Sequence, residues 1–283
     1  MMNKLQLFNF KHEDHVRAGL VFEGIHYSLA KGVDILDIAH NFSDFDFGII
    51  KNLEKLKAAE IDFLCPVINP GKVICVGMNY EDHIKELDRQ APAFPTFFSR
   101  FNHSFVAHSE NIPLSDLSDK YDYEAELAVI IGARAYKLDK TEAASYICGY
   151  SIFNDVTVRD YQVRTSQWFL GKNFYQTGSF GPYLVPALCL AANAQGLKVE
   201  TFVNEKILQS ASTSEMIFKP DELVYELARI MPLEKGDVII TGTPGGVAVS
   251  RTPRTYLKDG DICRIKIGEL GMLENKVIKE ELK

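Results

Sequence analysis

Three carboxylates in two separate segments are the residues best suited to hold a metal ion. Glu124 and Glu126 lie two apart in YDYEAELAVIIG, at the start of an apolar strand, and Asp155 ends the apolar run in GYSIFNDVTVRDYQ. Side chains two apart on a strand point to one face, and carboxylates that close raise each other's pKa unless a cation lies between them. Hard divalent cations such as Mg²⁺, Mn²⁺ or Ca²⁺ prefer such oxygen ligands. If the two strands are neighbours, Asp155 completes a three-carboxylate site.

The spacing of these carboxylates leaves other interpretations open. Acidic pairs at strand ends are usually solvated, and Asp155 also suits the N-cap of a helix that begins at Val156. A glycosidase pair, with Glu124 as the acid and Glu126 as the nucleophile, is a further alternative. Retaining glycosidases, however, take carboxylates about 5 Å apart from different elements that flank the scissile bond. Two glutamates side by side on one strand therefore favour chelation.

A histidine and a glutamate form the second candidate constellation. His83 and Glu86 are three residues apart in NYEDHIKEL, so they share a face if this stretch is a helix. A carboxylate that holds one imidazole nitrogen leaves the other free to take a proton from water. The alternative is an exposed polar helix whose histidine faces solvent.

Two loops supply further polar groups. Lys172 lies in GKNF, just after the single tryptophan, Trp168. The TGTPGG segment at 241–246 offers exposed backbone amides that suit an oxyanion or a carboxylate. It lacks the GxxxxGK[ST] spacing of a P-loop, and nothing in the sequence resembles a dinucleotide-binding fingerprint.

The elements that must position these residues follow from the pattern of apolar residues. Strands are predicted at KLQLFNF, AGLVFEG, 72–77, 126–135, 183–188, 237–244 and 261–267, and helices at VDILDIAH, LEKLKAAEI, 221–231 and after Thr141. Helices interrupt strands without strict alternation, which favours an α+β fold with a mostly mixed or antiparallel sheet. Prolines and a glycine in CPVINPGK mark a break. We therefore expect a small N-terminal α+β module over 1–70 and a larger domain over 71–283.

Composition excludes several classes of protein. Hydrophobic residues make up 46% and charged residues 24% of the 283 residues, which is typical of a globular chain and not of a disordered, collagen-like or coiled-coil one. The net charge of -7, with no Lys/Arg-rich block, argues against nucleic acid and anionic membrane surfaces as partners. The five cysteines form no CxxC pair, as expected for reduced thiols. No signal peptide and no stretch of roughly 20 apolar residues is present, so the sequence predicts a cytoplasmic location.

Read in order, nine segments between Lys72 and Val277 resemble the fumarylacetoacetate hydrolase family. They are KVICVGMNYEDHIKEL, PTFFSRF, YDYEAELAVIIGARA, GYSIFNDVTVRDYQ, GKNF, FGPYLV, MIFKPDELV, LEKGDVIITGTPGGV and GDICRIKIGELGMLENKV. The resemblance implies the family's mixed β-sheet fold, a homodimer and an Mg²⁺-type site. The E-x-E of the family's metal motif falls on Glu124 and Glu126, and the aspartate of its ND falls on Asp155.

The resemblance also implies roles for residues outside the metal motif. The lid motif of the acylpyruvate-cleaving members falls on His83 and Glu86. Their substrate-contacting Gln, Lys and second Thr of TGTP fall on Gln162, Lys172 and Thr243.

This chain departs from the family pattern at four positions. Met78 replaces an arginine of the acylpyruvate-cleaving members, and Tyr175 replaces the aspartate common after GKxF. Glu205 follows Asn204 where a glycine is usual, and Arg100 stands where a lysine is often found. The metal motif is intact, so these departures concern the substrate rather than the metal.

The predicted function is a metal-dependent hydrolase that cleaves a C–C bond in an acylpyruvate or 1,3-dicarbonyl-type carboxylic acid. The cation would spread the charge of a departing enolate as a Lewis acid. His83, oriented by Glu86, would deprotonate water, while Lys172 and Thr243 would hold the substrate carboxylate or oxyanion. Two alternatives stay open: an isomerase, hydratase or decarboxylase of 2-oxo acids on the same site, and a non-enzymatic metal-stabilised binding protein.

Overall fold

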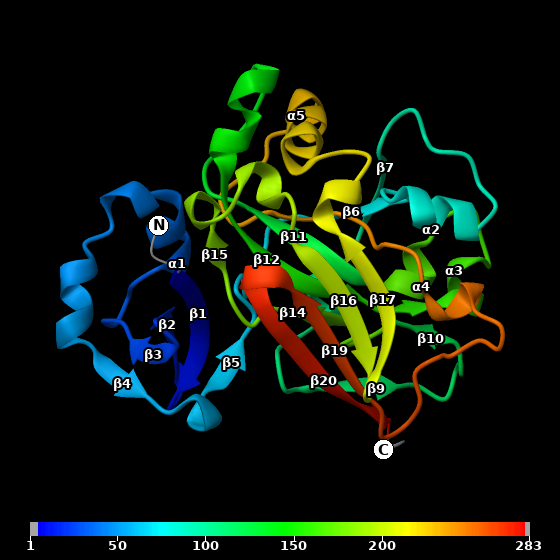
Figure 1. Cartoon of the computed structure of the whole chain (residues 1–283), viewed down its shortest axis with the longest axis horizontal. Helices are drawn as coiled ribbons and strands as arrows, with labels where there is room; N and C mark the ends of the chain where they lie inside the picture. The colour runs from blue at the N-terminus through cyan, green and yellow to red at the C-terminus, as the bar shows by residue number, and fades with distance from the viewer. Residues whose placement is uncertain (1–4, 281–283) are drawn as a thin grey trace.

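The first part of the chain builds a five-stranded antiparallel sheet. The structure is a computed structural model that describes residues 5–280 (Figure 1). The sheet has the order β4-β3-β2-β1-β5. Its strands are β1 (Leu5–His12), β2 (His15–Phe22), β3 (Ile25–Ser28), β4 (Glu54–Leu56) and β5 (Asp62–Leu64). Helix α1 (Ile35–His40) is present as predicted, and the Asp34 side chain caps it by accepting the Leu36 N–H.

The helix predicted at LEKLKAAEI is wrong. That stretch forms β4 and a short 3₁₀ turn, Ala58–Glu60. β4 pairs with β3 in antiparallel register, with Leu56 opposite His26. Backbone hydrogen bonds to the open edge of the sheet thus override the local helix preference of the stretch.

An eight-stranded mixed sheet forms the centre of the molecule. Its order is β7-β6-β18-β11-β12-β14-β8, and β15 also pairs with β12. Its strands are β6 (Val73–Gly77), β7 (Thr96–Ser99), β8 (Phe105–Val106), β11 (Ala125–Ile131), β12 (Ile147–Asp155), β14 (Gly178–Phe180), β15 (Val185–Pro186) and β18 (Val238–Ile240). The β6/β18 and β8/β14 pairs are parallel and the others antiparallel. The continuous apolar runs of β11 and β12 are fully buried.

A second five-stranded sheet packs beside it, in the order β17-β16-β19-β20-β9. Its strands are β9 (Asn111–Leu114), β16 (Lys198–Val203), β17 (Lys206–Ser212), β19 (Ile262–Ile267) and β20 (Gly271–Lys279). A two-stranded ribbon joins β10 (Tyr121–Asp122) to β13 (Thr157–Val158). Strands predicted at 72–77, 126–135 and 261–267 are confirmed, whereas 237–244 contributes only the three residues of β18 and 183–188 only the two residues of β15. The mixed sheets with few helices confirm the predicted α+β fold class.

Three short helices lie together on the side of the molecule away from the N-terminal sheet (Figure 1). They are α2 (Glu81–Glu86), α3 (Arg159–Gln162) and α4 (Phe169–Lys172). The helix predicted at 221–231 is α5 (Pro220–Ile230). The element expected after Thr141 is instead a 3₁₀ helix over Lys140–Tyr146, capped by Asp139, because β12 begins at the next residue and leaves room for only two turns.

The N-terminal sheet shares one apolar core with the central sheet. Leu7 and Leu20 belong to the same buried cluster as Val73 and Ile130. The backbones of Leu7 and Leu184 exchange two hydrogen bonds of 2.8 Å. This core includes residues from both sides of residue 70. The division of the chain into a module over 1–70 and a domain over 71–283 stays a prediction. Over residues 5–280, no helix has the length and apolarity needed to cross a membrane.

Candidate metal centre and active site

The ends of two paired strands bring three buried carboxylates together. Antiparallel pairing of β11 with β12 sets Ala125 opposite Asn154, so the residues on either side of Ala125 lie beside Asp155. One ligand oxygen from each of Glu124, Glu126 and Asp155 lies within 4.8 Å of the others. All three residues are at most 4% exposed. Asp155 ends a strand that leads into β13 and caps no helix at Val156, so the N-cap alternative is wrong.

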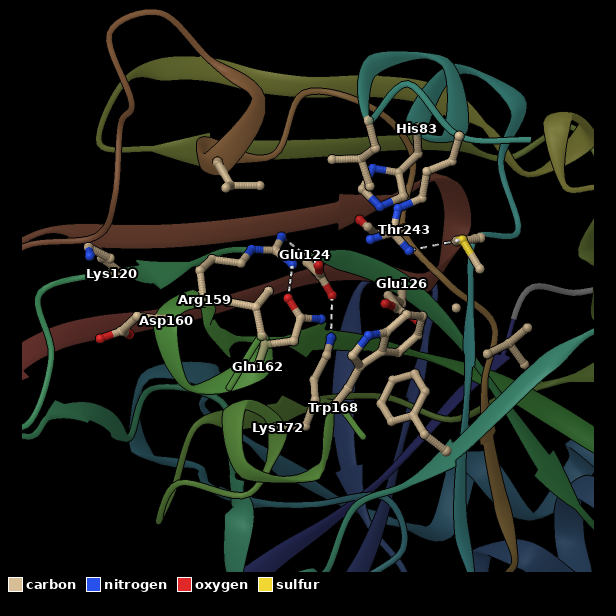
Figure 2. A pocket seen from close by; sticks show the side chains of 18 of the residues that line it. His83, Lys120, Glu124, Glu126, Arg159, Asp160, Gln162, Trp168, Lys172 and Thr243 are labelled. Atoms are coloured by element: carbon tan, nitrogen blue, oxygen red, sulfur yellow. Dashed lines mark hydrogen bonds and ion pairs between the residues drawn. The ribbon is translucent and has the colours of Figure 1, made fainter. Parts of the chain in front are cut away.

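Two buried cations contact the carboxylate cluster from neighbouring helices. Lys172, at the end of α4, donates from Nζ to Glu124 Oε2 at 2.5 Å and also to Asp155 Oδ2. Arg159, at the start of α3, donates from Nη2 to Glu124 Oε1 at 2.6 Å and from Nε to Asp122 Oδ2 at 2.8 Å. Figure 2 shows Arg159 and Lys172 converging on Glu124. The carboxylates are therefore ordered by cations that the chain itself provides.

The two glutamates have opposite pKa shifts because their neighbours differ. Burial alone would raise the pKa of Glu124, but Lys172 and Arg159 outweigh it and lower that pKa to about 2. Burial and the carboxylates of Asp155 and Glu124 raise the pKa of Glu126 well above its ordinary value. The predicted mutual rise in pKa is seen at Glu126, whereas at Glu124 two cations of the chain itself supply the exception that the prediction allowed for.

The donor set of this cluster fits a hard divalent cation. Its carboxylates are Asp122, Glu124, Glu126 and Asp155, and its cations are Arg100, Arg159 and Lys172. When all of them are ionised, one negative charge stays unbalanced in a buried environment. Buried charges are costly unless they are paired or bind a metal. Carboxylate oxygens are the ligands that Mg²⁺, Mn²⁺ and Ca²⁺ prefer.

Helix α2 places a histidine–glutamate pair at the same site. His83 Nδ1 and Glu86 Oε1 are 2.8 Å apart, so the predicted contact is present. Glu86 Oε2 accepts hydrogen bonds from the Gly246 N–H at 2.8 Å and from Ser250 Oγ at 2.7 Å. Burial tends to raise the pKa of Glu86, but these hydrogen bonds, with that of His83 foremost, lower it. An ionised Glu86 accepts a proton-bearing Nδ1, which leaves Nε2 as the basic nitrogen of His83.

The backbone amides of the TGTPGG loop are already engaged by the protein's own carboxylates. Gly242 donates to Glu126 Oε2, Gly245 to Asp82 Oδ2 at 3.0 Å, and Gly246 to Glu86 Oε2. The expectation that these amides bind an oxyanion or carboxylate of a ligand is therefore wrong for these three glycines. The loop instead holds α2 against the site.

A cavity of about 360 Å³ lies beside the carboxylates (Figure 2). The predicted residues that line it are His83, Glu124, Glu126, Gln162, Lys172 and Thr243. Glu86 and Asp155 do not line it. Its apolar lining includes Val76, Leu87, Phe98, Val163 and Trp168. Met78, one of the departures from the family pattern, also lines the cavity, and Arg89 Nη1 lies 3.8 Å from its sulfur. The structure thus gathers residues from α2, α3, α4, β11 and the loop at 241–246 around one space.

Three polar residues that support the site, Asp122, Arg159 and Gln209, escaped the sequence analysis. Asp122 accepts hydrogen bonds from Arg159 and from the amides of residues 248 and 249. Gln209, which is 1% exposed, donates to Thr243 Oγ1 at 2.8 Å. Little in the sequence marks Gln209, because KILQSAS also contains the polar residues Lys206, Ser210 and Ser212. Its burial and its partners become visible only in the folded chain.

Comparisons with known proteins agree with this geometry. Residues 72–278 match the family model described as fumarylacetoacetate (FAA) hydrolase C-terminal. The chain is 41% identical, over 80% of its own length and 72% of the relative's, to the protein named oxaloacetate tautomerase FAHD2A, mitochondrial, of Bos taurus.

Solved structures give the same result. A fumarylacetoacetate hydrolase from psychrophilic Exiguobacterium antarcticum is 35% identical with a TM-score of 0.87, covering 98% of this chain and 100% of that one. The 2-hydroxyhepta-2,4-diene-1,7-dioate isomerase from Mycobacterium marinum is 28% identical with a TM-score of 0.79, over 98% and 100% of the two chains. Because a family model matches most of its length and a relative above 40% identity covers four-fifths of it, this chain belongs to the fumarylacetoacetate hydrolase family.

Proposed function

We propose that this protein is a divalent-metal-dependent enzyme that interconverts the keto and enol forms of a 2-oxo dicarboxylic acid such as oxaloacetate. The observation that carries the proposal is a histidine–glutamate pair beside three clustered carboxylates at one cavity. The bovine relative is named an oxaloacetate tautomerase, and one similar solved structure is titled an isomerase. Both names describe rearrangements without fragmentation and support tautomerisation, whereas the Exiguobacterium antarcticum structure, titled a hydrolase, supports the second candidate below.

Glu124, Glu126 and Asp155 would hold the metal, with Mg²⁺ as the first choice and Mn²⁺ or Ca²⁺ as alternatives. One carboxylate oxygen from each of the three lies within 4.8 Å of the other two, and oxygen is the ligand that these cations prefer. A bound divalent ion would supply Lewis-acid polarisation of the 2-oxo group.

His83 is the proposed proton carrier. Its Nε2 takes a proton from the carbon next to the 2-oxo group and returns a proton to the carbonyl oxygen, so that one C–H bond breaks and one O–H bond forms. Glu86 holds Nδ1 through the contact of 2.8 Å and keeps the ring in this orientation. Thr243 and Gln162 line the cavity and can hydrogen-bond the oxygens of the substrate.

For Lys172 we propose a role beside the predicted contact with the substrate. Its Nζ contacts Glu124 and Asp155, and the residue is 2% exposed. Burial tends to lower the pKa of Lys172, but the Asp155 and Glu124 carboxylates raise it, so the amine is charged. We propose that Lys172 orders the carboxylates of Glu124 and Asp155, which would hold the metal. Only the part of its side chain that lines the cavity would contact the substrate.

Three cations on the cavity wall could bind a second carboxylate group of the substrate. Arg89, Lys120 and Arg254 line the same cavity as His83. Charge-assisted hydrogen bonds from such groups are about twice as strong as neutral ones. A dicarboxylic acid could therefore place one carboxylate near the metal and the other against these cations.

Hydrolysis of an acylpyruvate is the second candidate function. The observation that favours it is the size and apolar lining of the cavity, which a four-carbon diacid fills only in part. An acyl chain could pack against Leu87, Phe98 and Trp168. His83 would then deprotonate water instead of carbon.

Product analysis distinguishes the candidates. The purified chain with Mg²⁺ or Mn²⁺ is incubated with enol-oxaloacetate and with a panel of acylpyruvates, and products are followed by NMR and mass spectrometry. Tautomerisation conserves mass, hydrolysis yields two fragments, and decarboxylation releases CO₂. His83→Gln should lower kcat by about 10²- to 10⁴-fold while Mn²⁺ binding persists. Absence of turnover on every substrate would overturn both enzymatic candidates in favour of a metal-stabilised binding protein.

Two predictions concern the protein's state in the cell. The homodimer implied by the family resemblance stays a prediction, which sedimentation of the full chain tests. The cytoplasmic location also stays a prediction, and the name of the bovine relative makes the mitochondrion the alternative. Fractionation of cells that express the full chain distinguishes the two compartments.

A further inference from the structure

Arg100, a departure from the family pattern that was expected to concern the substrate, does not line the cavity and is a buried arginine next to the candidate metal centre. It follows β7 directly, is 1% exposed, and is the largest of the fully buried side chains in residues 5–280. An arginine is almost never fully buried unless its charge is paired. The partners of this guanidinium therefore decide what the residue does.

Four N–H groups of the guanidinium have protein acceptors. Nη1 donates to Asp155 Oδ1 and to the Val156 carbonyl oxygen at 3.2 Å. Nη2 donates to Thr177 Oγ1 at 2.8 Å, and Nε donates to Ser104 Oγ at 3.2 Å. These acceptors come from the end of β12 and from the residues just before β14 and β8. The planar fork of Arg100 thus joins three strands and has one orientation.

The surrounding residues leave room for this particular group. The Arg100 Cζ atom lies 5.7 Å from the centre of the Phe153 ring. Gly178 also lies against the guanidinium. A Cβ atom at this position would be 3.2 Å from both Cζ and Nε of Arg100. A larger residue at position 178 would crowd the guanidinium. The pocket is shaped for an arginine.

We infer that Arg100 is a positioning residue, which holds Asp155 so that one carboxylate oxygen faces the metal position. This inference rests on the proposed metal site. Oδ1 of Asp155 is occupied by Arg100, whereas Oδ2 points into the cluster and contacts Lys172. A hydrogen bond that fixes one oxygen of a carboxylate orients the other oxygen before a metal binds. Mutation of a residue that hydrogen-bonds a metal ligand in this way typically lowers metal affinity by about 10- to 100-fold. A lysine here would keep the charge but lose the fork that reaches Thr177 and Ser104 at the same time.

The test compares metal affinities in the absence of substrate. Titration of the purified full chain with Mn²⁺, with free Mn²⁺ followed by electron paramagnetic resonance, gives the dissociation constant directly. Arg100→Lys should weaken Mn²⁺ binding by about 10- to 100-fold while the protein keeps a cooperative thermal transition. The matched control is Arg264→Lys on β19, which alters an arginine paired with Glu274 away from the site and should leave the affinity unchanged.

A second variant keeps the inference falsifiable if Arg100→Lys does not fold. Thr177→Val removes one support of the guanidinium and leaves its contact with Asp155, so the affinity should fall by a smaller factor, about threefold. Folded Arg100→Lys with wild-type affinity overturns the inference, as does unchanged affinity in Thr177→Val when Arg100→Lys is unfolded. Wild-type protein that binds no Mn²⁺ overturns the metal site and the inference together. Mn²⁺ binding without turnover of any substrate overturns only the proposed reaction, and the comparison of variants still decides the role of Arg100.

Discussion

At the scale of single residues, two glutamates of similar sequence context have different functions in the electrostatics of the site. Glu124 contacts two cations and has a lowered pKa. Glu126 accepts the Gly242 amide but lies beside other carboxylates, and its pKa is raised. The unfavourable charge therefore resides mainly on Glu126. A divalent ion would relieve it, which links metal binding to the stability of the folded protein.

Glu126→Gln should stabilise the metal-free protein and abolish tight Mn²⁺ binding. Because the pKa of Glu126 is raised by folding, its contribution to stability is present below the ordinary glutamate pKa and is lost as pH rises through the raised value. The neutral amide avoids that loss, so we expect a higher Tm than that of the wild type at pH 8 and little difference at pH 4.5.

Thermal unfolding of EDTA-treated protein at the two pH values measures this effect. Glu205→Gln, whose side chain is 97% exposed, is the matched control and should leave Tm unchanged. A variant less stable than the wild type at pH 8 would contradict the electrostatic account of Glu126.

At the scale of elements, α2 depends on the loop that it covers. A helix of six residues is too short to be stable alone. Asp82 accepts the Gly245 amide, and Glu86 accepts the Gly246 amide and the Ser250 hydroxyl. The same contacts that orient His83 thus hold the helix in place, so the position of the proposed proton carrier depends on the docking of α2.

Glu86→Gln should loosen α2 in a pH-dependent way. The pKa of Glu86 is lowered by folding, so its contribution is present above the ordinary glutamate pKa of about 4.3 and is lost as pH falls through the lowered value. At pH 7 the variant should lose about 1–2 kcal/mol of protection, measured as faster amide hydrogen exchange over residues 81–87, and the difference should shrink towards pH 4.

The matched control lies on the same helix. Glu81→Gln removes an exposed partner of Lys85, with a side chain that is 70% exposed, and should leave exchange nearly unchanged. Equal exchange in Glu86→Gln and the wild type at pH 7 would show that Glu86 does not hold the helix.

At the scale of the whole molecule, the N-terminal sheet and the sheet that carries the site are joined by a common core. Leu7 is fully buried and belongs to a cluster that includes residues of β6, β11 and β18. The two sheets also exchange backbone hydrogen bonds between Leu7 and Leu184. We therefore expect the N-terminal sheet to contribute to the stability of the site without contributing a residue to it.

Leu7→Ala should lower the stability of the site at a distance. Loss of a buried leucine costs about 2–5 kcal/mol, and the single tryptophan, Trp168, lines the cavity and reports unfolding there by its fluorescence. Denaturant unfolding should show one transition with a lower midpoint, whereas Val16→Ala, at a residue of β2 that is 52% exposed, should change stability by less than about 0.5 kcal/mol. An unchanged Trp168 transition in Leu7→Ala would show that the two sheets unfold independently.

Local patterns alone determined a large part of this protein. The buried strands β11 and β12 follow from continuous apolar runs. The helix α5 and the contact between His83 and Glu86 follow from a period of 3.6 residues, and both kinds of pattern depend only on neighbouring residues. The order of motifs identified the family, and with it Glu124, Glu126 and Asp155. These features were predictable because each is written within a short segment of the chain.

Only the tertiary structure decided which charges meet. Arg100 contacts a carboxylate 55 residues away, and Lys172 contacts one that is 48 residues away. The amides of Gly242, Gly245 and Gly246 donate to side chains up to 163 residues distant. A pKa or a hydrogen bond depends on distance in space and on burial, and neither is encoded in the spacing of residues along the chain. The sequence therefore specified which groups the site contains, whereas folding determined which of them are free to act on a substrate.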